Sequence, residues 1–201
     1  MVATQGKSLE DLKKEHPNVD EFLLQKWERI FNVFFDRNNS HQMDWGDFYM
    51  VVRKARDIYG AESAQVQFAK KSLESLWEGL CKLADADDDQ LISIDEWINL
   101  LSKVDSKKQP KWFSDYSTFM FKLFDVSADG VMDLAEYSDG MNTYGFPEKQ
   151  CHEAFHTFAV DKKGQYTPTI TPETWAQYFH ELFYSTDKKA LGNHLFGVMK
   201  V

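Results

Sequence analysis

Oxygen-bearing side chains alternate along residues 125–136, DVSADGVMDLAE. Ca²⁺ is a hard cation that takes about six to eight oxygen ligands, and a loop of this length supplies them from its first, third, fifth, seventh, ninth and twelfth residues. Gly130 occupies the sixth position, where the sharp turn needs a residue that tolerates positive φ. The pattern predicts a Ca²⁺ site, with a water-mediated contact from Asp133 and direct ligands from Asp125, Ser127, Asp129, the Val131 carbonyl and the bidentate Glu136.

Residues 85–96, DADDDQLISIDE, offer the same pattern with more negative charge. The expected ligands are Asp85, Asp87, Asp89, the Leu91 carbonyl, Ser93 and Glu96. Three carboxylates so close together repel one another without a cation, which favours a metal-binding role. Gln90 stands at the turn position, where a left-handed conformation costs a non-glycine residue roughly 1–2 kcal/mol. Ile92, the eighth residue, is expected to pair with the neighbouring loop.

Residues 36–47, DRNNSHQMDWGD, form a third candidate loop, which closes on Asp47 instead of a glutamate. Aspartate is one methylene shorter and reaches an ion with one oxygen more easily than with two, which favours Mg²⁺ or weaker Ca²⁺ binding. His41 also occupies the turn position. Two interpretations therefore stay open, a weakened site and a vestigial loop. The ligands of the first interpretation are Asp36, Asn38, Ser40, the Gln42 carbonyl, Asp44 and Asp47.

The fourth candidate loop, within residues 161–174, lacks a ligand set. Aligning Ile170 to the eighth position puts Lys163 first and Thr174 last, and starting at Asp161 places Glu173 one residue too late. We therefore expect a degenerate loop without a metal ion. Its flanking helices are expected to persist, because each helix-loop-helix unit needs a partner to cover its apolar face.

Amphipathic helices flank all four loops, so the chain repeats one helix-loop-helix unit four times. The helix before the first loop carries a stripe of apolar residues, at steps of three and four from Trp27 on. The residues are Phe22, Trp27, Ile30, Phe31, Phe34 and Phe35. A helix, an acidic loop and a second helix make up the EF-hand motif. The fold class is therefore predicted as all-α, with four EF-hand units in two pairs packed into one compact body and minimal β bridges between paired loops.

A polar stretch, DSKKQPKW, separates the second unit from the third, and Pro110 within it disfavours helix at the residue before it. We expect an N-terminal EF-hand pair over residues 1–104, a linker over residues 105–111 and a C-terminal pair over residues 112–201. The first pair contains loops 36–47 and 85–96, and the second contains loop 125–136 and the degenerate loop 161–174.

Composition and charge exclude several classes of partner. Lys and Arg total 23 against 32 Asp and Glu, and the formal charge of −9 argues against nucleic acid or an anionic membrane. No apolar run approaches membrane-spanning length, and the first ten residues carry no secretion signal. Cys81 and Cys151 lie far apart in the sequence, so we expect reduced thiols in a cytoplasmic protein. We also expect a monomer.

In its loops and in its C-terminal segment, the chain resembles the sarcoplasmic calcium-binding protein and calexcitin family of EF-hand proteins. The resemblance rests on FDRNNSHQMDWGDF, LWEGLCKLADADDDQ and GNHLFGVMKV, and it extends over nearly the whole chain. It implies a compact pair of EF-hand domains, Ca²⁺ in the first three loops and an unused fourth loop. Together with the loops, it favours a cytosolic Ca²⁺ buffer or signalling protein that binds two or three ions.

Within that family the likeness includes proteins named juvenile hormone diol kinases, which implies an alternative function, phosphorylation of a lipophilic diol with ATP or GTP and Mg²⁺. A phosphate-binding loop needs Lys and then Ser or Thr directly after its last glycine, but Lys200 comes three residues after Gly197. DKKG at residues 161–164 is too short a pattern to indicate a GTPase. No spacing of histidines or carboxylates selects a catalytic residue, so a nucleotide or lipophilic partner is implied by resemblance alone.

A third function, a sensor that opens a groove for a target helix, is disfavoured by composition. Met-rich surfaces suit such grooves because the side chain is flexible, whereas this chain has seven Met against sixteen Phe. A stiff, closed core is therefore expected.

Overall fold

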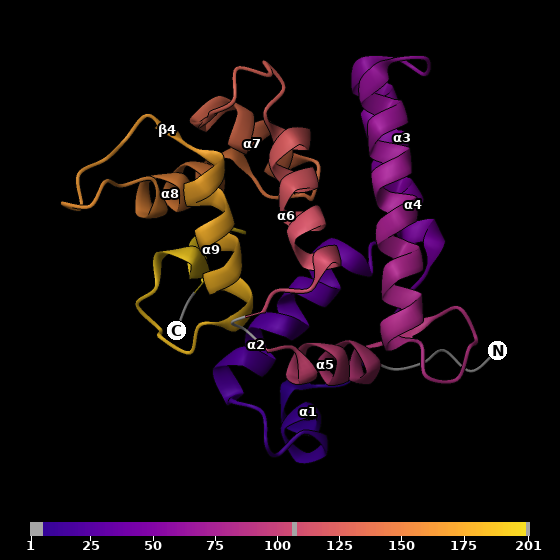
Figure 1. The fold of residues 1–201 in the computed structure, drawn as a ribbon. Helices are drawn as coiled ribbons and strands as arrows, with labels where there is room; N and C mark the ends of the chain where they lie inside the picture. The colour runs from indigo at the N-terminus through magenta and orange to yellow at the C-terminus, as the bar shows by residue number, and fades with distance from the viewer. Residues whose placement is uncertain (1–5, 106–107, 200–201) are drawn as a thin grey trace. The chain divides into compact units, whose positions relative to one another are not determined.

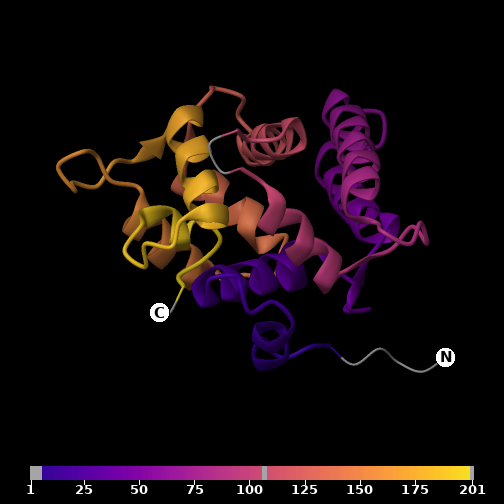
Figure 2. The ribbon, with the colours of Figure 1, turned by 60° about the horizontal axis from the view of Figure 1, so that its bottom comes forward.

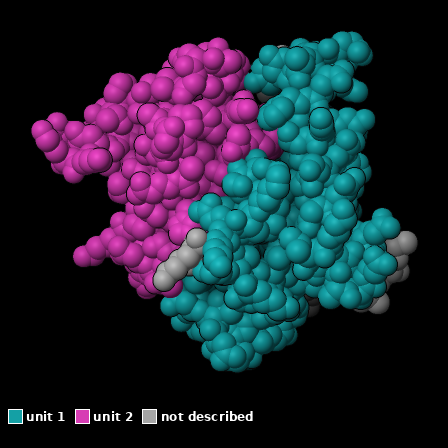
Figure 3. All heavy atoms as spheres, viewed as in Figure 1, with its two compact units in different colours: residues 1–115 teal, residues 116–201 magenta. Residues whose placement is uncertain are grey.

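The computed structural model describes residues 6–105 and 108–199 and consists mainly of helices, which confirms the all-α class (Figure 1). The contacts within the chain divide it into two units, residues 1–115 and 116–201, coloured separately in Figure 3. This division falls inside α6 (Lys111–Phe124). Residues 106 and 107 of the expected linker lie outside the described residues, and the domain boundaries expected from the sequence stay a prediction.

The first unit holds two helix-loop-helix segments whose loops are joined by two short strands. β1 pairs with β2 in antiparallel orientation, with Gln42 opposite Ser93 and Met43 opposite Ile92. Met43 and Ile92 are the eighth residues of their loops and are fully buried, so the pairing expected for Ile92 is confirmed. The elements are α1 (Leu9–Glu15), α2 (Glu21–Ile30), the π-helix η1 (Phe31–Phe35), β1 (Gln42–Met43), α3 (Trp45–Tyr59), α4 (Ala64–Ala84), β2 (Ile92–Ser93) and α5 (Ile94–Lys103).

Two elements of this unit were not expected from the sequence. α1 begins at a capping box, in which the Ser8 hydroxyl accepts the Asp11 N–H at 3.3 Å and the Asp11 carboxylate accepts the Ser8 N–H at 3.2 Å. The π-helix η1 continues α2 toward the first loop, and the Asp36 N–H donates to the Phe31 carbonyl at 2.8 Å, five residues back. α3 and α4 lie side by side in both ribbon views (Figures 1 and 2).

The second unit repeats this arrangement and adds a C-terminal turn. β3 pairs with β4, with Met132 opposite Ile170, so the fourth loop takes the register that places Ile170 at its eighth position. The C-terminal segment folds back on α9, and its Leu195 carbonyl accepts the hydroxyl of Tyr137 from α7 at 2.9 Å. The elements are β3 (Met132–Asp133), α7 (Leu134–Asn142), α8 (Glu148–Phe158), β4 (Thr169–Ile170), α9 (Pro172–Tyr184) and the 3₁₀ turn η2 (Leu191–His194).

Aromatic rings fill the core of each unit. In the first, the Phe35 and Trp97 ring centroids lie 5.0 Å apart; in the second, Tyr137 and Phe158 lie 5.2 Å apart. Such ring pairs add to the stabilisation from burial of apolar area. The aromatic stripe expected before the first loop is buried throughout, as predicted. None of the helices in the described residues is long and apolar enough to cross a membrane.

A tryptophan hydrogen bond occurs at the equivalent place in both units. The Trp97 indole N–H donates to the Trp27 carbonyl at 3.1 Å, and the Trp175 indole N–H donates to the Ser117 carbonyl at 3.0 Å. Each tryptophan follows the last position of the second loop of its pair, and each acceptor lies on the helix that leads into the first loop. The bond thus ties the two helix-loop-helix segments of a pair together inside the core.

Trp97→Phe and Trp175→Phe should each lower the free energy of unfolding by about 1–3 kcal/mol, because each removes a buried hydrogen bond and part of a packed ring. Urea denaturation in the presence of a chelator, followed by circular dichroism, measures the change. Trp45→Phe, at a half-exposed position, is the control and should change stability much less. Equal losses in all three variants would contradict a role for the two hydrogen bonds.

Candidate metal sites

The second loop gathers three acidic side chains at one point. One carboxylate oxygen from each of Asp85, Asp87 and Asp89 lies within 4.8 Å of the others. Asp85 is oriented by its own loop, since its Oδ1 accepts the Asp89 N–H at 3.2 Å and its Oδ2 accepts the Gln90 N–H at 2.9 Å. Partial loss of hydration and the nearby Asp89 carboxylate raise the pKa of Asp87. A cation held between these oxygens would relieve their repulsion.

The third loop contains a carboxylate oxygen that its own fold does not satisfy. Asp125 Oδ1 is buried and has no hydrogen-bond partner among the described residues, whereas Oδ2 accepts the Gly130 N–H at 3.2 Å. Asp129 is held by the Val131 N–H, which donates to Oδ1 at 3.0 Å. Because a buried carboxylate oxygen without a partner is costly, Asp125 fits a site whose cation supplies the missing interaction.

The first loop buries both of its end carboxylates, leaving Asp36 2% and Asp47 1% exposed. Asp36 Oδ1 accepts the Ser40 N–H at 2.8 Å, and Oδ2 accepts the His41 N–H at 3.0 Å. The Ser40 hydroxyl in turn donates to the Gln42 carbonyl at 2.8 Å. Burial raises the pKa of Asp47, although hydrogen bonds from loop amides act in the opposite direction. Two buried acids in one loop fit a cation site, because a cation would offset the cost of burying their charge.

Two left-handed residues shape the backbone of each of these three loops. At the sixth position φ is +65° for His41, +61° for Gln90 and +86° for Gly130. At the fourth position φ is +56° for Asn39, +60° for Asp88 and +57° for Ala128. The sequence predicts the left-handed residue at the sixth position, but sequence reasoning missed the one at the fourth. Asn and Asp tolerate this conformation and could have signalled it in two loops, whereas an alanine gives no signal.

The ninth and twelfth residues join each loop to the helix that follows it. The ninth residue is the N-cap, and its side chain accepts the N–H of the twelfth. The carboxylate of the twelfth residue accepts the N–H of the ninth in return. These capping boxes consist of Asp44 with Asp47, Ser93 with Glu96, and Asp133 with Glu136. The residues expected to bind metal are therefore also the residues that start the helix.

The second oxygen of each twelfth residue reaches back to the beginning of its loop. Asp47 Oδ1 accepts the Arg37 N–H at 2.9 Å, Glu96 Oε1 accepts the Ala86 N–H at 2.9 Å, and Glu136 Oε1 accepts the Ser127 N–H at 2.9 Å. Each carboxylate thus lies across its loop with both oxygens engaged. The twelfth residue of such a loop is the one that offers two oxygens to Ca²⁺.

The fourth loop is closed by hydrogen bonds of a different kind. Asp161 Oδ1 accepts the Lys163 N–H at 2.7 Å and the Gln165 N–H at 2.9 Å. Thr171 caps α9 by accepting the Thr174 N–H at 3.3 Å, and Glu173 is exposed. The arrangement keeps the helix-loop-helix shape without gathering carboxylates, and the expectation of a degenerate loop stays a prediction.

A second acidic cluster lies outside the loops, at Glu15, His16 and Asp95. The Lys7 ammonium contacts both Glu15 and Asp95, and His16 Nε2 lies 2.9 Å from Asp95 Oδ1. Burial acts to raise the pKa of Asp95, but hydrogen bonds from Lys7 and His16 outweigh this effect and lower that pKa. Lys7 supplies the positive charge that a metal ion would provide in a metal site. Its contacts anchor the segment before α1 to α5. Contacts so distant in sequence leave no local signal, and sequence reasoning missed them.

The donor set of the three acidic loops suits one class of ion. Carboxylate, hydroxyl, amide and carbonyl oxygens match hard cations such as Ca²⁺ and Mg²⁺, whereas softer metals select thiolate or imidazole. The His41 ring lines a neighbouring pocket, and Cys81 and Cys151 lie on α4 and α8. The loops therefore fit an oxygen-ligated divalent cation.

Comparison with known proteins gives several clear similarities. No family model matches the chain. Calexcitin-1 of Caenorhabditis elegans is 70% identical over 196 residues, which cover 98% of this chain and 96% of that protein. The sarcoplasmic calcium-binding proteins I, III and IV of Branchiostoma lanceolatum are 25% identical over 186 residues, which cover 89% and 98% of the two chains. The solved structure of an amphioxus sarcoplasmic calcium-binding protein has a TM-score of 0.75 at 22% identity, over 90% of this chain and 100% of that one. This structural likeness shows the fold.

Gln90→Gly and Gly130→Ala should change stability in opposite directions. Glycine at φ +61° removes the left-handed cost of Gln90, whereas alanine at φ +86° introduces one, so we expect a gain and a loss of about 1 kcal/mol respectively. Urea denaturation of the chelated protein measures both free energies of unfolding. Changes of the same sign would show that backbone strain at the sixth position does not determine the free energy of unfolding.

Proposed function

Since the chain belongs to the calexcitin and sarcoplasmic calcium-binding protein family, we propose that it binds Ca²⁺ through its second and third loops and a divalent cation through its first. The ligands of the second loop are Asp85, Asp87, Asp89, the Leu91 carbonyl and Glu96. Those of the third are Asp125, Ser127, Asp129, the Val131 carbonyl and Glu136. Those of the first are Asp36, Asn38, Ser40, the Gln42 carbonyl and Asp47.

The observation that carries this proposal is the repeated geometry of the three loops. Each has left-handed residues at its fourth and sixth positions, and in each the twelfth carboxylate bonds to amides at both ends of the loop. Three segments with different sequences thus reach the same backbone shape. The fourth loop, which lacks the ligand pattern, has a single residue of this kind at Gly164. A metal-binding requirement accounts for the difference.

The first loop is proposed to favour Mg²⁺ more than the other two loops do. Asp47 is fully buried and its side chain is one methylene shorter than those of Glu96 and Glu136, so it has less freedom to approach an ion as a bidentate ligand. Mg²⁺ accepts about six ligands at short distances, whereas Ca²⁺ gains from a seventh. Single-oxygen ligation by Asp47 therefore suits Mg²⁺, or Ca²⁺ at lower affinity.

In the cell we propose a cytoplasmic, monomeric Ca²⁺ buffer or signalling protein. The formal charge of −9 supports this proposal, because bound divalent ions would relieve the self-repulsion of the chain and raise its stability. The alternative, phosphorylation of a lipophilic diol, has no structural observation in its favour. Incubation of folded protein with Mg-nucleotide and the diol tests that alternative through the appearance of phosphorylated product.

Glu96→Gln and Glu136→Gln should each remove one Ca²⁺ from the stoichiometry measured by calorimetry on metal-stripped protein. Each replacement deletes the bidentate carboxylate on which seven-fold coordination depends. Glu173→Gln, in the fourth loop, is the matched control and should leave the stoichiometry unchanged. If wild-type protein binds no Ca²⁺ below millimolar concentration, the proposed function is wrong.

Asp47→Glu should raise the Ca²⁺ affinity of the first loop relative to its Mg²⁺ affinity, because the longer side chain can offer two oxygens. Calorimetric titration with Ca²⁺, with and without resting-cell Mg²⁺, measures the ratio. Since Asp47 is fully buried, retained helicity of the variant must be checked by circular dichroism. An unchanged or lower ratio in folded protein would contradict the proposed role of Asp47.

A further inference from the structure

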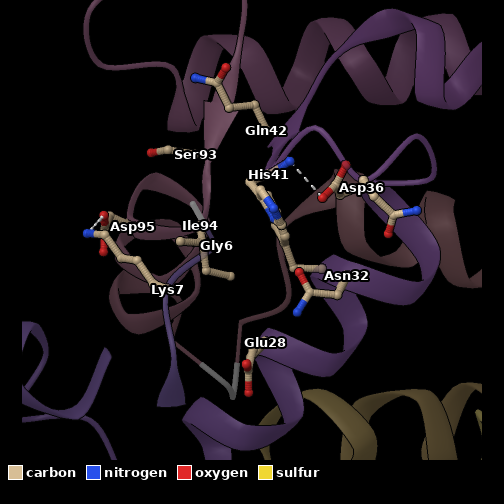
Figure 4. A pocket seen from close by; sticks show the side chains of 12 residues that line it. Gly6, Lys7, Glu28, Asn32, Asp36, His41, Gln42, Ser93, Ile94 and Asp95 are labelled. Carbon is tan, nitrogen blue, oxygen red and sulfur yellow. Dashed lines mark hydrogen bonds and ion pairs between the residues drawn. The ribbon is translucent and has the colours of Figure 1, made fainter. Parts of the chain in front are cut away.

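A pocket of about 650 Å³ lies in the first unit, beside the first loop (Figure 4). Its walls come from the segment at Gly6 and Lys7, from the continuous helix of α2 and η1, and from the paired loops around β1 and β2. Its volume falls within the range of about 300–1,000 Å³ that is usual for small-molecule sites. Asp36 and Gln42 of the first loop and Ser93 of the second line the pocket, whereas none of the proposed carboxylate ligands of the second and third loops does.

Several polar side chains that line this pocket have no partner in the described part of the chain, and three of them matter for its chemistry. They are the Glu28 carboxylate, the Asn32 amide and the His41 ring, none of which makes a hydrogen bond or ion pair with another described residue. Glu28 and Asn32 lie four residues apart on one helix, and the His41 ring packs against the backbone of Gly6. Figure 4 shows these three side chains among those that line the pocket, with the Lys7 and Asp95 pair at another side of it.

Glu28 is the member of this group that the fold does not explain. It is half-buried, and burial raises the pKa of its carboxyl group without a compensating cation. Lys7, the nearby cation, contacts Glu15 and Asp95 instead. A half-buried acid without a partner destabilises the folded state, whereas binding sites commonly hold such groups ready for a ligand. About one turn after Glu28, at Phe31, the helix changes from α to π geometry. Such π segments are frequent at functional sites.

The chemistry of the lining identifies the class of ligand. Glu28 leaves a negative charge uncompensated, so the pocket favours a cation. Neither Glu28 nor His41 belongs to a group of acidic, histidine or cysteine side chains that could hold a metal ion in the described residues. A planar guanidinium offers five N–H donors, pairs well with a carboxylate and stacks on flat rings. We propose that this pocket binds a guanidinium group, with Glu28 as its counter-ion and Asn32 and His41 as further contacts.

Titration of the full-length, Ca²⁺-loaded protein with agmatine and with N-acetyl-arginine methylamide, followed by amide chemical shifts, tests this proposal. We expect saturable binding at one site, weakened at least about tenfold in Glu28→Gln because a charge-assisted hydrogen bond is lost. Glu78→Gln removes the same charge from an exposed position on α4 and should bind as wild type does. Tighter binding of agmatine indicates a small guanidinium compound as the ligand, and tighter binding of the blocked arginine indicates an arginine side chain of a protein.

N-acetyl-citrulline methylamide, a neutral compound of the same shape, should not bind. Three outcomes overturn the proposal: no saturable binding of either guanidinium compound, unchanged affinity in Glu28→Gln, or equal losses in Glu28→Gln and Glu78→Gln. Asn32→Leu, which leaves all charges in place, is a second variant and should also weaken binding.

The stability of Glu28→Gln shows whether a loss of binding reflects misfolding. Because burial raises the pKa of Glu28, the folded state loses stability as pH rises and this carboxyl ionises. The variant should therefore melt at a higher temperature than wild type near neutral pH, and the gain should shrink near about pH 4, where the carboxyl is protonated. A lower melting temperature at neutral pH would assign Glu28 a structural role and overturn its assignment as an unpaired ligand group.

Discussion

A short loop can surround a divalent cation only if its backbone turns sharply enough to aim several oxygens at one point. In the three acidic loops, left-handed residues at the fourth and sixth positions produce that turn, although five of the six are not glycine. Such residues cost free energy, and so do the crowded carboxylates that the turn brings together. A cation held in the loop would offset both costs. The same capping boxes that position the twelfth residue of each loop also set the first turn of the following helix.

Pairing of the units explains why the fourth helix-loop-helix segment keeps its shape while lacking a ligand set. Its eighth residue, Ile170, pairs with Met132, and Trp175 donates its indole N–H to the Ser117 carbonyl inside the core. Each helix-loop-helix segment has a large apolar face that must be buried, and the partner segment of the pair covers it. The first unit uses the same two devices, through Met43 with Ile92 and through Trp97 with Trp27. In the second unit these devices hold the fourth segment in place beside the third loop.

The first loop and the pocket of the first unit share part of their backbone. His41 donates its N–H to Asp36 within the loop, while its ring lines the pocket against Gly6. If metal binding to the first loop moved His41, it would change the affinity of the pocket for its ligand. By linkage, a ligand in the pocket would change the metal affinity of the loop by the same factor. His41 has a left-handed backbone conformation, with φ +65°, and its ring lies against Gly6.

The sequence by itself determined the all-α class, the four repeated units, the aromatic stripe before the first loop and the candidate ligands, because ligand spacing, helical periodicity and turn residues are local properties. It did not predict α1, the π-helix before Asp36 or the left-handed fourth position of the third loop, where Ala128 gives no signal. Only the tertiary structure decided the register of the fourth loop, the tie between Lys7 and Asp95, and the pocket at Glu28. These features depend on residues brought together from distant parts of the chain, and such contacts leave no pattern in the local sequence.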